Sequence, residues 1–262
     1  MEINFHRMAN VNRHDPIRER YYSPLEAAEF WGNVIFIVAT GISVFLVTVS
    51  RESSVKLYNF LQLALVVLAF VSFAIGVVAR LYLFPRATQA RAADQLSNSF
   101  GVPLAQHTTK GYYNNPLPNG HSRLAATTLE NCFFSMEIAK EMCLWTRIQA
   151  LLAIIVFIFM LREEDLAFAA IAAATIFGEQ IVVRCIRLEY FRSRCESVYE
   201  RLYSLFLNKP EEMIFNASAV EQFNVYESTK AVAAITLSSR IFKKKNDDLT
   251  NEWDERRRAL NI

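Results

Sequence analysis

The sequence predicts an all-α membrane protein with four transmembrane helices, arranged as two hairpins that carry long cytoplasmic helical extensions. Each of four apolar stretches is close to the ~20 residues that a helix needs to cross a bilayer. These stretches are residues 31–50, 58–79, 145–161 and 166–183. Short connectors join the first two and the last two, whereas a long and mostly polar segment separates the pairs. We therefore expect two helical hairpins.

The distribution of positive charge predicts the orientation. Most of the 28 Lys and Arg residues lie outside the connectors, and an even number of spans places the remaining segments on one face. Positively charged segments stay on the cytoplasmic side, so we expect both termini there. The two hairpins then comprise residues 31–84 and 145–184. The cytoplasmic parts are an amino-terminal segment (1–30), a helix-loop-helix segment (85–144) and a helical tail (185–262).

The helical pattern continues past the second span as far as Pro85. Proline removes a backbone donor and disfavours helix in the residue before it, so we expect a kink or a break there. The pattern resumes over residues 86–99, and Gly101 is expected to end it. The segment 102–120 is rich in Pro and Gly and predicts a loop.

A helix that begins near Ser122 is expected to run into the third span and reach about 60 Å in length. The fourth span similarly continues to Leu207, before Pro210. This continuation carries an apolar stripe in steps of three and four residues, typical of a coiled-coil seam or a bundle face. We favour packing against the Ser122 helix over a subunit contact. The stripe, our oligomerisation candidate, comprises Leu188, Phe191, Cys195, Val198, Leu202 and Leu205.

The tail beyond Pro210 is expected to contain two helices. Ser218 and Glu221 form a capping-box pattern that predicts a helix start, and residues 251–260 predict a second helix. Two basic clusters, 243–245 and 256–258, are either solvated faces or contacts with anionic lipid.

Within the fourth span, small residues at a spacing of four predict close helix packing: Ala170, Ala174 and Gly178. Ionisable and polar groups at the inner ends of the spans have two interpretations, a structural ion pair with snorkelling arginines or a charged ring at the mouth of a pore. These groups are Glu179, Gln180, Arg80, Arg147 and Arg184.

No pattern predicts an enzyme, a metal site or a bound cofactor. The four cysteines lie in or near the cytoplasmic segments, where thiols stay reduced, and they form no paired CxxC motif. The sequence also lacks a metal-binding HExxH motif, a phosphate-binding glycine loop and a GxSxG elbow. A net charge of +2 gives no indication of DNA binding.

The string from Gly111 to Pro116 is the most distinctive in the chain, with two tyrosines and two asparagines. Tyrosine faces can stack on a base and asparagine amides can both donate and accept hydrogen bonds, so the string could bind a ligand, a peptide or a neighbouring subunit. The alternative, which we favour, is a loop held on the helices by its own tyrosines.

The two hairpins, together with residues 91–101, 111–115 and 131–135, resemble the SMODS-associating four-transmembrane effector domain family. The resemblance covers the chain from about Asn10 to Leu207. It implies an effector in the bacterial inner membrane, often encoded beside a nucleotidyltransferase that makes a cyclic oligonucleotide after phage infection. The implied action is membrane disruption.

On this basis we expect a homo-oligomer in the lipid bilayer that forms a pore or disrupts the membrane on receiving a cytoplasmic signal, with a cyclic oligonucleotide as the candidate ligand. The candidate ligand-binding residues are Asp94, Asn98, Tyr112, Tyr113, Asn114 and Asn115. The alternative is a membrane-anchored scaffold that recruits a cytosolic partner through the central loop and the tail.

Overall fold

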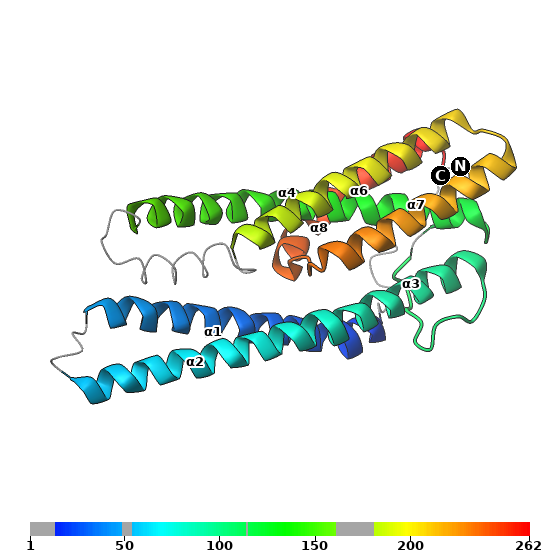
Figure 1. Ribbon diagram of the computed structural model, residues 1–262. Coiled ribbons are helices and arrows are strands. Elements are labelled where there is room, and N and C mark those ends of the chain that lie inside the picture. Colours follow the sequence, from blue (N-terminus) through cyan, green and yellow to red (C-terminus); the bar gives the residue numbers. More distant parts are fainter. Residues whose placement is uncertain (1–13, 49–53, 114, 161–180) are drawn as a thin grey trace. The chain divides into compact units, whose positions relative to one another are not determined.

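The computed structural model describes residues 14–48, 54–113, 115–160 and 181–262, and every regular element in these ranges is a helix (Figure 1). The chain folds as two compact units. The first, here called the hairpin unit, contains residues 1–94 and 105–112; the second, here called the bundle unit, contains residues 95–104 and 113–262. The all-helical fold class predicted from the sequence is confirmed over the described residues.

The hairpin unit is built on two long apolar helices, α1 (Ser23–Thr48) and α2 (Val55–Val78), which pack side by side (Figure 1). Two helical runs that begin in this unit, Arg18–Ser43 and Val55–Phe100, are long and apolar enough to cross a membrane. The side chains of α2 include no buried residue. Large apolar groups instead cover its surface, so its stability in this fold depends on an apolar surrounding.

Both helices of the hairpin unit contain a π-helical turn that ends two residues before a proline. The turn η2 (Arg18–Tyr22) precedes Pro24, and η3 (Ala79–Leu83) precedes Pro85. In each turn the hydrogen bond spans five residues, from the Ser23 N–H to the Arg18 carbonyl and from the Phe84 N–H to the Ala79 carbonyl. The helix then continues through the proline into α3 (Phe84–Phe100).

Of the two outcomes expected at Pro85, the break is therefore wrong, because the helix continues through the proline with a changed hydrogen-bonding pattern. A proline ring clashes with the carbonyl four residues earlier in an α-helix, and the wider π-turn shifts the hydrogen-bonding pattern just before the ring. The predicted end at Gly101 is confirmed: Gly101 has a φ of +69°, and its N–H and that of Val102 donate to the Ser97 carbonyl. The positive φ favours glycine at this position, where a Cβ would also meet the Asn119 side chain.

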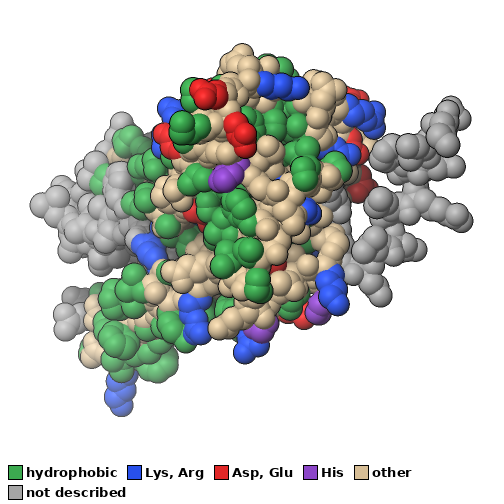
Figure 2. Space-filling model, turned by 90° about the vertical axis from the view of Figure 1, so that its right-hand side faces the viewer, with side chains coloured by type: hydrophobic (Ala, Val, Ile, Leu, Met, Phe, Trp, Pro, Cys, Tyr) green, Lys and Arg blue, Asp and Glu red, His purple; other side chains and the backbone are tan. Residues whose placement is uncertain are grey.

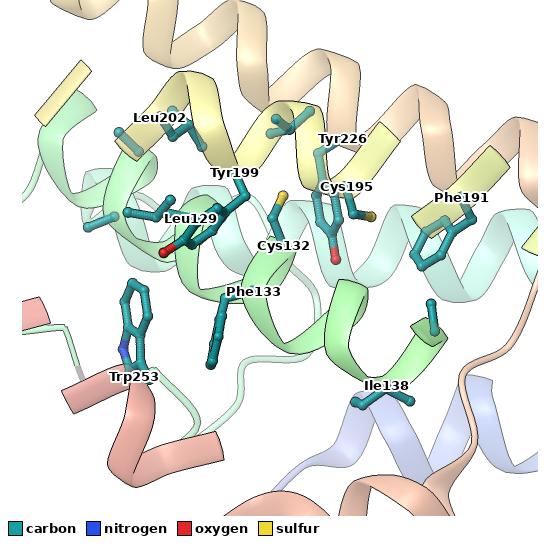
Figure 3. Close-up of a cluster of buried hydrophobic side chains, with 14 of the residues drawn as sticks. Leu129, Cys132, Phe133, Ile138, Phe191, Cys195, Tyr199, Leu202, Tyr226 and Trp253 are labelled. Atoms are coloured by element: carbon teal, nitrogen blue, oxygen red, sulfur yellow. The ribbon is translucent and has the colours of Figure 1, made fainter. Parts of the chain in front are cut away.

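The bundle unit consists of α4 (His121–Met160), α6 (Val182–Asn208), α7 (Glu212–Ala233) and α8 (Ser239–Leu260). The long helix expected from Ser122 is confirmed by α4. The helix expected to end near Leu207 is confirmed by α6 from Val182 onward, while residues 161–180 lie outside the described residues. Helices α4, α6 and α7 pack against one another, and α8 closes the core with Trp253, which stacks on Phe133 with ring centroids 6.0 Å apart (Figure 3).

The stripe on α6 lies inside this core. All six of its residues are buried, and they pack with the Cys132 and Phe133 side chains of α4 (Figure 3). The structure thus supports packing against the Ser122 helix, and the stripe is not exposed for the subunit contact that was its other interpretation.

The tail helices begin earlier than the sequence predicted. Helix α7 starts at Glu212, so Ser218 lies inside it and does not cap it. Helix α8 starts at Ser239, where the Ser238 hydroxyl accepts a hydrogen bond from the Ile241 N–H at 3.3 Å. The capping-box match was misleading because a tertiary contact extends the helix ahead of Ser218: the Phe215 ring in the first turn of α7 packs edge-on against Phe206 of α6, with ring centroids 5.4 Å apart.

One carboxylate lies close to the core. Glu227 on α7 forms an ion pair with Lys230, with 2.6 Å between Glu227 Oε1 and Lys230 Nζ. Burial raises the pKa of the Glu227 carboxyl above its ordinary value, and the Lys230 ammonium offsets part of that shift. The charged form of Glu227 therefore costs the folded state more than the neutral form does.

Several residues singled out in the sequence lie outside the described residues. They are Asn114, Ala170, Ala174, Gly178, Glu179 and Gln180.

Leu202→Ala is expected to lower the free energy of unfolding by about 2–5 kcal/mol, because it leaves a cavity in the core of the bundle unit. Leu207→Ala on the same helix is the matched control, since Leu202 is 0% exposed and Leu207 is 58% exposed. Leu207→Ala should change stability by less than about 0.5 kcal/mol. Thermal and denaturant unfolding of the detergent-solubilised protein measures both, and similar losses would contradict the intramolecular packing of the stripe.

Glu227→Gln is expected to change how stability depends on pH. Because the folded-state pKa is raised, the folded protein binds more protons than the unfolded chain between the ordinary carboxyl pKa and the raised one. Wild-type stability relative to Glu227→Gln should thus be greatest below the ordinary carboxyl pKa of about 4.3 and decline as the pH rises through the raised folded-state pKa. Glu221 on the same helix is exposed, and Glu221→Gln is the control. The difference in unfolding free energy between wild type and this variant should not change with pH. An increase with pH in the Glu227 difference would show that the sign is wrong.

Candidate functional site

The best-defined polar site of the hairpin unit surrounds Arg91 on α3. Arg91 Nη2 lies 2.7 Å from Asp15 Oδ2, and both side chains are largely buried. The guanidinium carbon also lies 4.4 Å from the centre of the Tyr112 ring and 5.7 Å from that of Tyr22. Arginine suits such a site because its planar group can pair with a carboxylate and stack on aromatic faces together. We call these four residues the Arg91 clasp.

The clasp joins three segments that are far apart in the sequence. Asp15 also accepts a hydrogen bond from the Arg18 N–H at 3.0 Å, at the start of the π-turn η2, and Tyr22 is the last residue of that turn. Tyr112 comes from the loop after α3. The Arg91 side chain therefore ties the base of α1 and the central loop to α3.

Asp94 holds the same loop from the next turn of α3. Its carboxylate accepts hydrogen bonds from the Thr109 N–H at 3.1 Å and from the Thr109 hydroxyl at 2.7 Å, and the side chain is buried. His14 and Lys110 exchange two backbone hydrogen bonds, at 3.2 and 3.0 Å. The loop is thus pinned to α3 on one side and to the amino-terminal segment on the other.

In the bundle unit, the remaining loop candidates have mostly structural roles. The Asn115 Oδ1 accepts from the Leu117 N–H at 3.0 Å, and its Nδ2 donates to the Arg123 carbonyl at 3.3 Å. Tyr113 is half-buried. Asn98 is also half-buried, and its Oδ1 has no hydrogen-bond partner among the described residues. The candidates therefore do not form one cluster: Asp94 and Tyr112 belong to the hairpin unit, and Asn98, Tyr113 and Asn115 to the bundle unit.

A buried polar ladder fixes the carboxy-terminal part of α3 in the bundle unit. Gln95 Nε2 donates to Thr128 Oγ1 at 2.9 Å, and Asn131 Nδ2 donates to Gln95 Oε1 at 3.0 Å. Gln95 and Thr128 are fully buried. A buried amide without partners would be costly, so this ladder favours one register of α3 on α4.

The Arg147 side chain on α4 forms an ion pair with Glu189 on α6, with 2.9 Å between Arg147 Nη2 and Glu189 Oε2. The Arg147 hydrogen bond holds the pKa of Glu189 below its ordinary value. Burial, with Glu189 nearby, raises the pKa of the Cys143 thiol to about 12, so this thiol stays protonated and unreactive. For Arg147, a structural ion pair is thus present. Arg80 lies in η3 and Arg184 in the first turn of α6, both half-buried.

The described residues contain no group of three or more His, Cys, Asp and Glu side chains that could hold a metal ion. The four cysteines are free, and three of them are buried. Charges of both signs are interspersed over the face drawn in Figure 2, so that face presents no large patch of one sign. The chemistry that the site offers is ion pairing and aromatic stacking, which suit binding and switching.

Sequence reasoning found Asp94 and Tyr112 but missed Arg91, Asp15 and Tyr22. Arg91 and Asp94 are three residues apart, so they share a helix face, and that spacing was the available signal. The partner Asp15 lies 76 residues away from Arg91, and no local pattern can predict such a pair.

Comparisons of the chain with protein-family models, with curated proteins and with solved structures give no match. The resemblance to the four-transmembrane effector family therefore stays a prediction that rests on its short motifs.

Arg91→Ala is expected to release the loop that the clasp holds, because Asp15 loses its ion-pair partner and Tyr112 its stacking partner. Loss of about 1–3 kcal/mol of local stability would raise the rate of tryptic cleavage after Lys110 roughly 5- to 100-fold, if cleavage follows local opening. Mass spectrometry of the fragments measures that cut.

The matched control is Arg86→Ala. Arg86 lies on the same helix and stacks on Tyr82 with 4.7 Å between the guanidinium carbon and the ring centre, but it is exposed. Cleavage after Lys110 should be unchanged in this variant. Equal rates in the two variants would contradict the role of the clasp.

Proposed function

We propose that this chain is a membrane effector of a bacterial anti-phage defence system. It resides in the inner membrane as a multi-pass protein with both termini in the cytoplasm, and it oligomerises to form a pore or disrupt the membrane when a cytoplasmic signal arrives. The candidate signal is a cyclic oligonucleotide.

The observation that carries the proposal is the exposed apolar surface of α1 and α2. Their side chains include Ile37, Phe60, Phe70 and Phe73, each of which is about two-thirds exposed or more. Soluble monomers rarely expose large contiguous apolar surfaces, and lipid would cover such a surface. A hairpin of this length and composition fits a bilayer.

The membrane end of α4 supports a second hairpin. From Trp145 onward, α4 exposes large apolar side chains, among them Leu151, Leu152 and Ile158. Trp145 itself is 61% exposed, and an indole ring at this position suits the headgroup region. Together with the apolar sequence 166–183, these exposed groups favour four spans in two hairpins.

The Arg91 clasp supports control by a signal. A ligand shifts a conformational equilibrium only through its different affinities for the two states. Arg91 Nη2 already pairs with Asp15, and the guanidinium lies over the Tyr112 ring. An anionic ligand that takes this position on Nη2 must displace Asp15, and a base that stacks on the same face of Tyr112 must compete with Arg91. Either exchange would release the base of α1, directly beside η2.

The test uses the full chain in liposomes that contain a fluorescent dye. Cyclic di- and trinucleotides added on the cytoplasmic side should trigger dye release from wild-type liposomes. Arg91→Ala should release dye without any nucleotide, because its clasp is already open, whereas Arg86→Ala should behave as wild type. Absence of release with every nucleotide and in Arg91→Ala would contradict the effector function, and would favour the alternative of a membrane-anchored scaffold.

A further inference from the structure

The first turns of α8 carry a small basic surface. Arg240, Lys243 and Lys244 are exposed, and we call these three residues the basic edge. Neither Lys243 nor Lys244 forms an ion pair with another described residue. The adjacent Lys245 is different, because its Nζ lies 2.9 Å from Glu141 Oε2 on α4. Lys244 lies close enough to Glu141 to lower the pKa of that carboxyl, but Lys245 forms the direct pair, so the side chains of the basic edge stay exposed.

Two contacts place the basic edge beside the membrane end of α4. The Ser238 N–H lies 3.4 Å from Met142 Sδ, and Lys245 pairs with Glu141. The exposed apolar surface of α4 begins at Leu144 and Trp145. From Met142 to Trp145 the helix rises only about 4.5 Å, so the positive charges lie next to the surface that we assign to lipid.

The stability of α8 itself does not explain this arrangement. The amino-terminal end of a helix carries a partial positive charge, which disfavours cations and favours acidic residues. The first turn of α8 contains no acidic residue. Asp247 and Asp248 follow about one turn later, where they lie further from the start of the helix. An anionic partner outside the bundle would account for the basic residues.

The second basic cluster of the tail has a different role. Arg256 donates a hydrogen bond to the Tyr199 hydroxyl at 2.6 Å, and its guanidinium carbon lies 4.6 Å from the centre of the Phe133 ring. Arg257 pairs with Asp254 at 3.2 Å. Arg256 therefore holds α8 on the core, whereas Arg257 pairs within α8. The cluster starts about 18 Å along the helix from Lys244.

We propose that the basic edge binds the anionic phospholipid headgroups of the cytoplasmic leaflet. The proposal rests on the membrane location proposed above and adds the lipid class and the residues that recognise it. Each basic side chain near an anionic bilayer strengthens the attraction on the order of five-fold. The contact would hold the start of α8 at the membrane surface, while Trp253 and Arg256 hold the rest of that helix on α4 and α6.

The test compares full-length protein in vesicles of phosphatidylcholine with protein in vesicles that also contain phosphatidylglycerol. An amine-reactive label, quantified by mass spectrometry, reports the accessibility of each lysine. Lys243 and Lys244 should label several-fold more slowly in the anionic vesicles, and high salt should remove the difference. The exposed Lys209, which follows the end of α6, should label equally in both and serves as the internal control.

A second measurement uses variants of the detergent-solubilised chain and short-chain phosphatidylglycerol. The double variant Lys243→Gln, Lys244→Gln should bind this lipid at least ten-fold more weakly than wild type. The double variant Arg257→Gln, Arg258→Gln removes the same charge from the other cluster and should bind as wild type does. Competition by inorganic phosphate as strong as that by the lipid would show a general anion site and overturn the proposal.

The outcomes also separate this proposal from the proposed function. Equal labelling of Lys243 and Lys244 in the two kinds of vesicle, in a chain that alkaline carbonate does not extract, contradicts the lipid contact alone. A chain that carbonate extracts from the vesicles contradicts both. Dye release, by contrast, bears only on the effector function.

Discussion

Burial of the α6 stripe against α4 is the interaction on which the bundle unit depends. Leu188, Phe191, Cys195, Val198 and Leu202 are each no more than 2% exposed, and they form the centre of the hydrophobic cluster that also receives α7 and α8. Tyr226 of α7 and Trp253 of α8 join the same buried cluster, where Tyr226 hydrogen-bonds with the Ser135 hydroxyl and Trp253 stacks on Phe133. The tail helices therefore share one hydrophobic core with α4 and α6, and the tail is not an independent module.

A second constraint governs the hairpin unit, where the helices continue through prolines. The turns η2 and η3 absorb the missing backbone donor of Pro24 and Pro85 by widening the helix just before each ring. A π-turn changes the angular position of the residues on either side of it, so it also determines which face of α1 and of α3 meets its neighbours. The Arg91 clasp acts directly on η2 through Asp15 and Tyr22. A ligand that opens the Arg91 clasp, as proposed, would therefore change the contacts of η2 and the orientation of α1.

Polar contacts, rather than apolar burial, fix the segment around Asp94 and Gln95 of α3. Asp94 binds Thr109 in one unit, and Gln95, its neighbour in the chain, binds Thr128 and Asn131 in the other. Buried polar groups favour a single arrangement, because a slipped register leaves them unsatisfied. Consecutive residues of one helix thus serve different units, and a change at either could reach the other through the backbone of α3.

The sequence by itself determined the all-helical class, the extents of α4 and α6 and the helix end at Gly101, because apolar periodicity and glycine conformation are local properties. It also predicted the stripe of α6 and its favoured packing. Only the tertiary structure decided that Ser218 lies inside α7, since the contact of Phe215 with Phe206 of α6 extends the helix ahead of the capping pattern. The π-turn at Pro85, the pairing of Asp15 with Arg91 and the position of the basic edge beside Met142 were likewise decided there. Each depends on which distant segments meet, and local patterns carry no information about that.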